Sequence, residues 1–203
     1  DLSAEAVIAA TRDAELLLVC YAPVTAECIS GARRLRAIIK YGVGIDQIDI
    51  SAAAAAGIPV VNVPAYAEET VAEGAVTLLL ALLRRLPTQL AACAAGGGWA
   101  PPTPALCGRE ACGKTVGVVG FGRIGRAFAR MCGGGFRMRV LCYDPHVDAA
   151  AVEAAVPAGA GYRVEWWGEL RAMLAECDIV SLHATLSPAS RHLLGPAEFA
   201  SMR

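Results

Sequence analysis

Several features that mark particular protein classes are scarce or missing in this sequence. Its 18 Lys and Arg residues nearly balance its 19 Asp and Glu residues, and the net charge is −1. A protein with no basic excess offers no broad positive surface to a nucleic acid, so we expect no nucleic-acid partner. The eight cysteines contain no Cys-x-x-Cys pair, which is the spacing typical of zinc and redox sites.

Long apolar runs are absent as well. The stretch 75–83 is interrupted by Thr77 and is far shorter than the roughly 18–20 apolar residues of a membrane span. The first residues, DLSAEAVIAATRD, are acidic and amphipathic and do not resemble a signal peptide. We therefore expect no membrane partner and a cytoplasmic location, although an organelle transit peptide could precede these residues.

The cysteines are expected to be reduced and mostly buried. Cys20 and Cys142 lie in apolar strand-like segments, and Cys132 and Cys177 fall on the apolar faces of predicted helices. Buried cysteines behave as small apolar side chains in a reducing compartment. A disulfide framework or a metal site is the alternative, and we predict no metal.

Helical and strand-like segments alternate along the whole chain, which favours parallel sheets covered by helices. Strands are predicted at 16–20, which we expect to be fully buried, at 37–39 and at 60–63. Short helices are predicted from about Thr25 and from Ser51. A capping box at 70–73 is expected to open the longest helix, whose apolar stripe would be Val71, Ala75, Leu78, Leu79, Leu82 and Leu86.

A glycine- and proline-rich segment, AAGGGWAPPTP at 94–104, is predicted to have no regular structure. We place the junction between two lobes there, with one lobe at residues 1–97 and the other at 98–203. The long helix, at about 70–86, would bridge the lobes.

One motif carries specific chemistry. The apolar strand 116–119 runs into Gly120-Phe121-Gly122-Arg123-Ile124-Gly125, where a helix begins at once. Gly120 would allow a tight turn, Gly122 would let the backbone approach a diphosphate, and Gly125 would let the helix pack against the strand. The free N–H groups and the positive end of the helix dipole would stabilise the phosphates, so the motif predicts dinucleotide binding.

An acidic residue at the end of the next apolar strand indicates which dinucleotide is bound. Asp144 could accept hydrogen bonds from the adenosine ribose hydroxyls, and its charge would repel the extra phosphate of NADP. We therefore predict NAD as the cofactor.

Several further blocks add to this motif: KYGVGID at 40–46, GIPVVNVP at 57–64, TVAE at 70–73, and the dipeptide Asp144-Pro145. Together with the glycine motif, their order resembles the D-isomer-specific 2-hydroxyacid dehydrogenase family over nearly the whole chain. The resemblance implies an α/β protein with a flavodoxin-like substrate-binding lobe and a Rossmann-type NAD-binding lobe, both incomplete here.

The resemblance also implies a set of binding residues. Backbone amides of Val43 and Gly44 would hold the substrate carboxylate, and Arg123 and Ile124 would line the diphosphate mainly through their N–H groups. Val63, Thr70 and Ala184 would contact the cofactor, although a buried strand end for Val63 and a helix cap for Thr70 are plain structural alternatives. The family usually has proline where this chain has Thr185.

The residues that perform the chemistry of this family are not matched here. Relatives use an arginine, an acid and a histidine that would lie beyond Arg203, and none of His146, His183 and His192 stands in the catalytic position. We therefore expect a fragment of an NAD-dependent oxidoreductase that acts on the CH–OH group of a D-2-hydroxy acid, inactive as residues 1–203 alone. The substrate could be phosphoglycerate, glyoxylate or hydroxypyruvate, or a branched 2-oxo acid.

Two alternatives remain at this point. The segment AYAEET at 65–70 has some similarity to the C-terminal-binding-protein branch of the family, which implies an NAD-sensing corepressor that recognises protein partners. The other alternative is an inert, truncated gene product. The resemblance further implies a homodimer that forms through the NAD-binding lobe and the long helix.

Overall fold

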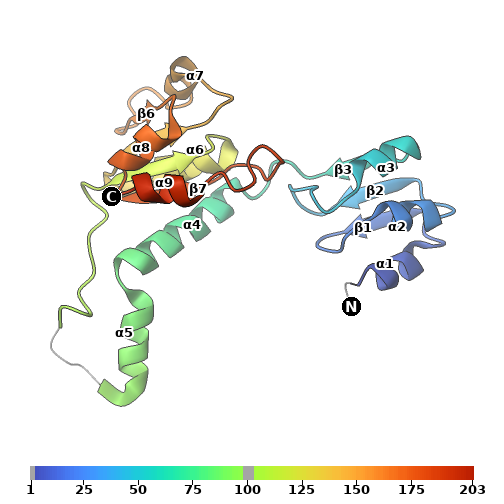
Figure 1. The fold of residues 1–203 in the computed structure, drawn as a ribbon, viewed down its shortest axis with the longest axis horizontal. Helices are drawn as coiled ribbons and strands as arrows, with labels where there is room; N and C mark the ends of the chain where they lie inside the picture. The colour runs from blue at the N-terminus through green and yellow to red at the C-terminus, as the bar shows by residue number, and fades with distance from the viewer. Residues whose placement is uncertain (1–2, 98–102) are drawn as a thin grey trace. The chain divides into compact units, whose positions relative to one another are not determined.

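The computed structural model describes residues 3–97 and 103–203, and the chain divides into two compact units, Asp1–Tyr66 and Ala67–Arg203. Each unit is built on one parallel sheet (Figure 1). This arrangement confirms the predicted α/β class.

The first unit contains a sheet with the strand order β1-β2-β3. Its elements in chain order are α1 (Ala4–Thr11), β1 (Leu16–Val19), α2 (Ala26–Gly31), β2 (Ala37–Lys40), α3 (Ile50–Ala55) and β3 (Val60–Asn62). The first two helices are capped by the hydroxyls of Ser3 and Thr25, which accept hydrogen bonds from the Ala6 and Cys28 N–H groups. The third helix begins at Ile50 instead of Ser51, because the Asp49 carboxylate caps it.

Only one face of this sheet carries a core in the described residues. Leu17, Ile38 and Val60 pair across the three strands and pack in the core of the unit. The neighbouring row, which includes Leu18 and Val61, points to the other face and is exposed. The prediction of a fully buried first strand is therefore wrong, because side chains alternate between the faces of a strand and the helices cover one face.

The second unit contains a four-stranded parallel sheet with the order β6-β5-β4-β7. Its strands are β4 (Thr115–Val119), β5 (Arg139–Tyr143), β6 (Val164–Trp166) and β7 (Ile179–Leu182). Its α-helices are α4 (Glu68–Leu83), α5 (Leu86–Ala92), α6 (Arg123–Arg130), α7 (Ala149–Ala154), α8 (Leu170–Glu176) and α9 (Pro196–Ser201). The π-helical turn η2 (Met131–Gly135) extends α6, and η1 (Cys93–Gly97) follows α5 with a left-handed break at Gly96, whose φ is +79°.

Both faces of the central strand β4 are buried. Val116 and Val118 pack with Phe128 of α6 and with the buried side chains of α4. Val119 packs on the opposite side with Met173 and Leu174 of α8. Helices thus cover both faces of this sheet, as expected for a parallel sheet (Figure 1).

The helix α4 differs from its prediction in two ways. It begins at Glu68 after Ala67, which makes no side-chain cap, so Thr70 lies inside the first turn and the capping-box prediction is wrong. The buried residues of α4 are Ala72, Val76 and Leu79, whereas Leu78 and Leu82 of the predicted stripe are 68% and 76% exposed. The helix α4 carries apolar side chains on most of its sides, so its sequence does not select one buried face. Packing against α6 selects it.

The boundary between the two units falls between Tyr66 and Ala67, not between residues 97 and 98 as the glycine- and proline-rich segment indicates. The reason is that α4 shares a core with β4 and α6, so it belongs to the second unit. Residues 98–102 of that segment lie outside the described residues, and η1 covers its start.

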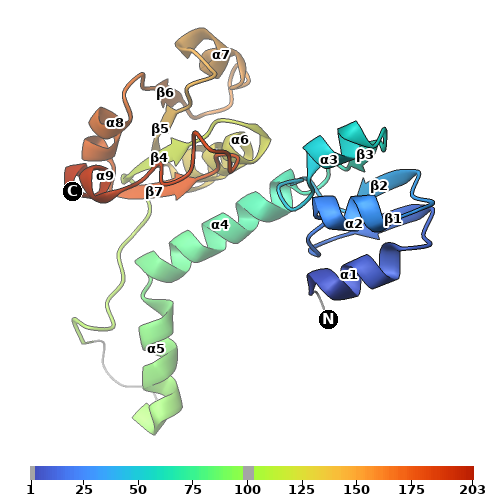
Figure 2. The same ribbon diagram turned by 45° about the vertical axis from the view of Figure 1, so that its right-hand side comes forward.

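In the described part of the chain, no single helix has the length and apolar composition needed to cross a membrane. One bent pair of helical segments, Glu68–Leu83 and Leu86–Gly96 with 59° between them, passes that test by length and composition only (Figure 2).

None of the eight cysteines forms a disulfide, and Cys28, Cys132, Cys142 and Cys177 are buried. Burial raises the pKa of Cys132 and Cys142 to about 12 and that of Cys177 to about 11, so these thiols stay protonated. The described residues contain no cluster of three or more His, Cys, Asp or Glu side chains that could hold a metal ion.

The position of α6 depends on Gly125. A β-carbon built there would lie 2.1 Å from the carbonyl oxygen of Gly120 and 3.3 Å from a methyl group of Val118. Only a glycine allows the helix to lie this close to the end of β4, as the sequence predicts.

We expect Gly125→Ala to lower the free energy of unfolding by about 1–3 kcal/mol, because the added methyl group overlaps backbone atoms. Gly74→Ala in α4 is the matched control: nothing lies within 4 Å of its β-carbon position, and alanine favours a helix by roughly 0.5–1 kcal/mol over glycine. Urea unfolding followed by circular dichroism measures both. A Gly125→Ala protein as stable as the unmodified one would contradict this packing.

Candidate functional site

Three chain segments meet at the carboxyl ends of the strands in the second unit. Gly120 follows β4, Asp144 follows β5, and Ala184 lies two residues beyond β7. In parallel α/β sheets, ligands bind at this edge, near the point where the chain crosses from one side of the sheet to the other. Here that point lies between β4 and β7, because β5 and β6 lie on one side of β4 and β7 on the other.

The turn at Gly120 needs glycine for two reasons. Its φ is +93°, a conformation that residues with a side chain rarely adopt. A β-carbon there would also lie 2.7 Å from the backbone nitrogen of Ala184. The close approach therefore joins the predicted glycine turn to the segment after β7, where the sequence places a cofactor contact at Ala184.

The start of α6 faces open space. Gly122 is the N-cap residue, and no atom lies within 4 Å of the position that a β-carbon would take there. Arg123 and Ile124 are the first two helical residues, so their N–H groups point out of the start of the helix. This arrangement of N–H groups at a helix start, helix dipole and missing side chain fits a diphosphate.

The Asp144 carboxylate is held beside the glycine turn. Its Oδ2 atom accepts a hydrogen bond of 2.8 Å from the Phe121 N–H, and its Oδ1 atom accepts one of 2.8 Å from the His146 N–H. Each carboxylate oxygen can accept further bonds, so ribose hydroxyls could still be recognised. The structure thus brings Asp144 next to the motif, as the sequence predicts.

The Arg123 side chain takes part in an ion pair that sequence reasoning did not anticipate. Its Nε atom lies 4.0 Å from the Glu68 carboxylate in the first turn of α4. Further along α6, Arg130 pairs with Glu69 at 2.5 Å. These pairs join α6 to α4 and direct the Arg123 guanidinium toward α4, which agrees with a backbone role at the diphosphate.

Two further predicted cofactor residues, Thr70 and Val63, do not belong to the strand-end loops of the second unit. Thr70 is exposed in the first turn of α4. Val63 belongs to the first unit, directly after β3, and its N–H donates to the carbonyl of Gly42. Their cofactor contacts stay predictions.

The predicted substrate residues line a pocket of the first unit. Val43 and Gly44 lie in the loop after β2, at the edge of a cavity of about 340 Å³ at the carboxyl ends of β1 and β2. The Asn62 side chain donates a 2.7 Å hydrogen bond to the Val43 carbonyl and holds this loop. Lys40 also lines the cavity, and sequence reasoning assigned it no role. The sequence does contain one sign of such a role, because Lys40 is a charged residue that directly follows the apolar run 37–39.

His183 follows β7 and is mostly enclosed. Its Nε2 atom and the Ser181 hydroxyl form a 2.9 Å hydrogen bond, and its ring lies 4.9 Å from that of Phe128. Burial lowers the pKa of His183, so the ring is neutral at neutral pH. A side chain held between Ser181 and Phe128 suits a strand-end position better than a proton carrier, as the sequence indicates.

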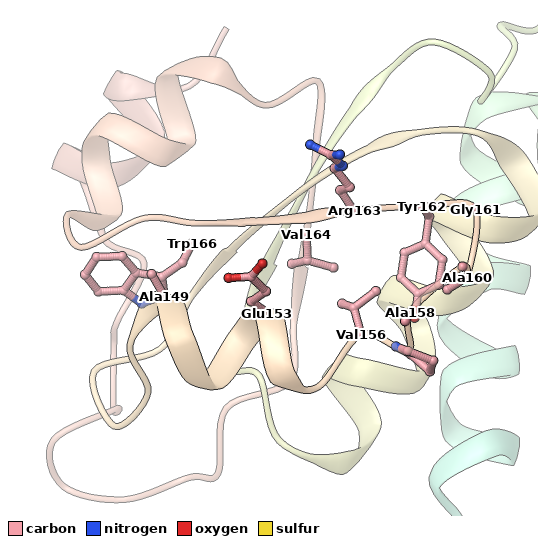
Figure 3. A pocket seen from close by; sticks show the side chains of 12 residues that line it. Ala149, Glu153, Val156, Ala158, Ala160, Gly161, Tyr162, Arg163, Val164 and Trp166 are labelled. Atoms are coloured by element: carbon pink, nitrogen blue, oxygen red, sulfur yellow. The ribbon is translucent and has the colours of Figure 1, made fainter.

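A larger hollow of about 820 Å³ lies between α7, β6 and the loop that joins them (Figure 3). Val156 and Val164 line it, and the Arg163 side chain points away from α7. Neither the glycines of the motif nor Asp144 line this hollow. Its size alone therefore does not make it the cofactor site.

Comparison with known proteins gives the same assignment. Residues 76–203 match the family model of the D-isomer specific 2-hydroxyacid dehydrogenase, NAD binding domain. A D-3-phosphoglycerate dehydrogenase of Methanocaldococcus jannaschii is 34% identical over 203 residues, all of this chain. A D-lactate dehydrogenase of Escherichia coli is 37% identical over 165 residues, or 79% of the chain.

Solved structures are similar as well. The crystal structure of D-lactate dehydrogenase from Aquifex aeolicus, complexed with NAD and lactic acid, has a TM-score of 0.81 and 30% identity over 97% of this chain. The chain spans 56% of that structure's chain, and 37% and 45% of the two curated relatives. It belongs to the D-isomer specific 2-hydroxyacid dehydrogenase family and carries that family's NAD-binding domain.

Proposed function

We propose that the protein is an NAD-dependent oxidoreductase that interconverts a D-2-hydroxy acid and the corresponding 2-oxo acid. The observation that carries this proposal is the arrangement around Gly120: a left-handed glycine turn, an open helix N-terminus at Gly122 and a carboxylate at Asp144. Bound NAD would accept or return the hydride, and the protein groups would bind and orient the reactants.

Each group has a distinct task in this proposal. The N–H groups of Arg123 and Ile124 bind the diphosphate, and Asp144 binds the adenosine ribose. The N–H groups of Val43 and Gly44 bind the substrate carboxylate, because consecutive backbone donors in a loop form a concave anion site. The proton of the hydroxyl group is transferred by residues outside 1–203, as the resemblance implies.

The direct test is oxidation of NADH by the product of the whole gene with a panel of 2-oxo acids. We expect turnover with at least one of them, and D-hydroxy acid as the product on a chiral column. Residues 1–203 produced separately should show no turnover. If the whole product binds NADH but reduces none of the acids, a role as an NAD-sensing binding protein replaces this proposal.

Asp144 should determine the choice between NAD and NADP. We expect Asp144→Ala and Asp144→Asn to weaken NADH binding by roughly ten- to a hundredfold, because a hydrogen bond to a charged group is lost. NADPH binding should not weaken, since a repulsive charge is removed. Isothermal titration calorimetry measures both cofactors.

The asparagine variant keeps an acceptor for the Phe121 N–H and so separates loss of charge from loss of the turn. Asp148→Ala, which removes the carboxylate that caps α7 a few residues away, is the matched control and should leave the cofactor preference unchanged. An unaltered ratio of the NADH and NADPH dissociation constants in both Asp144 variants would refute the assignment.

We also propose that the protein forms a homodimer through α4. Its support is the exposure of Leu78 and Leu82, which lie one turn apart on the helix surface away from α6. Leu90 of the adjoining α5 is exposed too. Clustered large apolar side chains on a helix surface are typical of interfaces between proteins.

We expect the double change Leu78→Glu and Leu82→Glu to convert a dimer into a monomer, because two carboxylates would be buried without partners. Sedimentation-velocity ultracentrifugation measures the change. Val61→Glu makes the same kind of replacement at an exposed apolar position outside α4 and should leave the dimer intact. A dimer that survives the double change would place the interface elsewhere.

A further inference from the structure

The cavity in the first unit contains a buried positive charge. Lys40 is the last residue of β2, the central strand of its sheet, and only 8% of the residue is exposed. It lies on the same face of the strand as the core residue Ile38, but at the carboxyl end of the sheet. This is the edge where parallel sheets bind ligands.

The ammonium group of Lys40 has only neutral partners. It donates a hydrogen bond to the carbonyl oxygen of Cys20, and it lies 5.5 Å from the centre of the Tyr21 ring. In the described parts of the chain, residues 3–97 and 103–203, no carboxylate forms an ion pair with it. One carbonyl leaves two of the three ammonium N–H groups available.

A buried charge without a counter-charge is costly, and proteins normally neutralise such groups or pair them. The one acidic residue along the cavity is Asp46, which is exposed and whose Oδ1 atom lies beside Gly44. It does not reach Lys40 within ion-pair distance. The cavity of about 340 Å³ thus contains an ammonium group that does not form an ion pair with the carboxylate along it.

The same cavity is lined by Val43 and Gly44, whose N–H groups bind the substrate carboxylate in the proposed function. Backbone amides suffice to orient one carboxylate. A full positive charge in the same cavity matches a second anionic group on the same molecule.

We propose that Lys40 is a substrate-binding residue that selects acids with two anionic groups. The substrate class is then a 2-hydroxy or 2-oxo acid whose far end carries a carboxylate or a phosphate. This inference rests on the proposed function, since it assumes that the substrate carboxylate occupies the loop of Val43 and Gly44.

The test uses the product of the whole gene and two matched pairs of substrates. Hydroxypyruvate is compared with its 3-phosphate, and 2-oxovalerate with 2-oxoglutarate; the second member of each pair carries the additional anionic group. We expect the unmodified protein to prefer the doubly charged member of at least one pair, and the pair that responds identifies phosphate or carboxylate.

Lys40→Met should reduce kcat/KM for the preferred doubly charged acid by roughly ten- to a hundredfold, mainly through KM, because a charge-assisted hydrogen bond is lost. The singly charged partner should change by less than about threefold, or 0.7 kcal/mol. Lys40→Arg keeps the charge and should keep the preference. Lys114→Met, the same replacement at the start of β4, is the control and should alter neither acid.

Equal losses for both members of a pair would reduce Lys40 to a structural role, and a preference of the unmodified protein for singly charged acids would also overturn the proposal. A second measurement does not require turnover or a folded variant. Malonate should raise the melting temperature of the unmodified protein more than acetate does at equal ionic strength, and no difference would count against the inference. Failure of the proposed function itself would appear separately, as absent NADH binding in calorimetry.

Discussion

The close approach of α6 to the end of β4 is the contact on which the second unit depends. Gly125 lies so near the carbonyl of Gly120 that any side chain would overlap it, and Gly120 in turn lies against the backbone of Ala184. Three segments are thereby held together within van der Waals contact. The Asp144 carboxylate is held beside the start of α6 by its hydrogen bond from the Phe121 N–H.

The two units present opposite charges at the ends of their strands. In the second unit, the Asp144 carboxylate lies beside the N–H groups at the start of α6, an arrangement suited to hydroxyl groups and a diphosphate. In the first unit, the buried Lys40 side chain and the loop of Val43 and Gly44 line one cavity. In both units the candidate binding groups lie where parallel strands end and open toward a loop.

Much of the cofactor site could be predicted from the sequence because its parts are local. Gly120, Gly122 and Gly125 act within one strand–turn–helix unit, and Asp144 follows the next strand, so spacing alone indicates their roles. The buried face of α4 could not be predicted, because the helix carries apolar side chains on most of its sides. Only contact with α6 selects Ala72, Val76 and Leu79. For the same reason the unit boundary lies at Tyr66, before α4, although composition indicates a break near residue 97.

The sequence by itself determined the α/β class, the dinucleotide motif, the acidic residue after β5 and the resemblance to the family. The tertiary structure decided to which unit α4 belongs, that Arg123 pairs with Glu68, and that Lys40 is buried with no carboxylate partner among the described residues. The physical reason is the distance along the chain between the residues that interact. Turn conformation and helix capping depend on neighbours a few residues away, whereas burial and charge pairing depend on segments that only folding brings together.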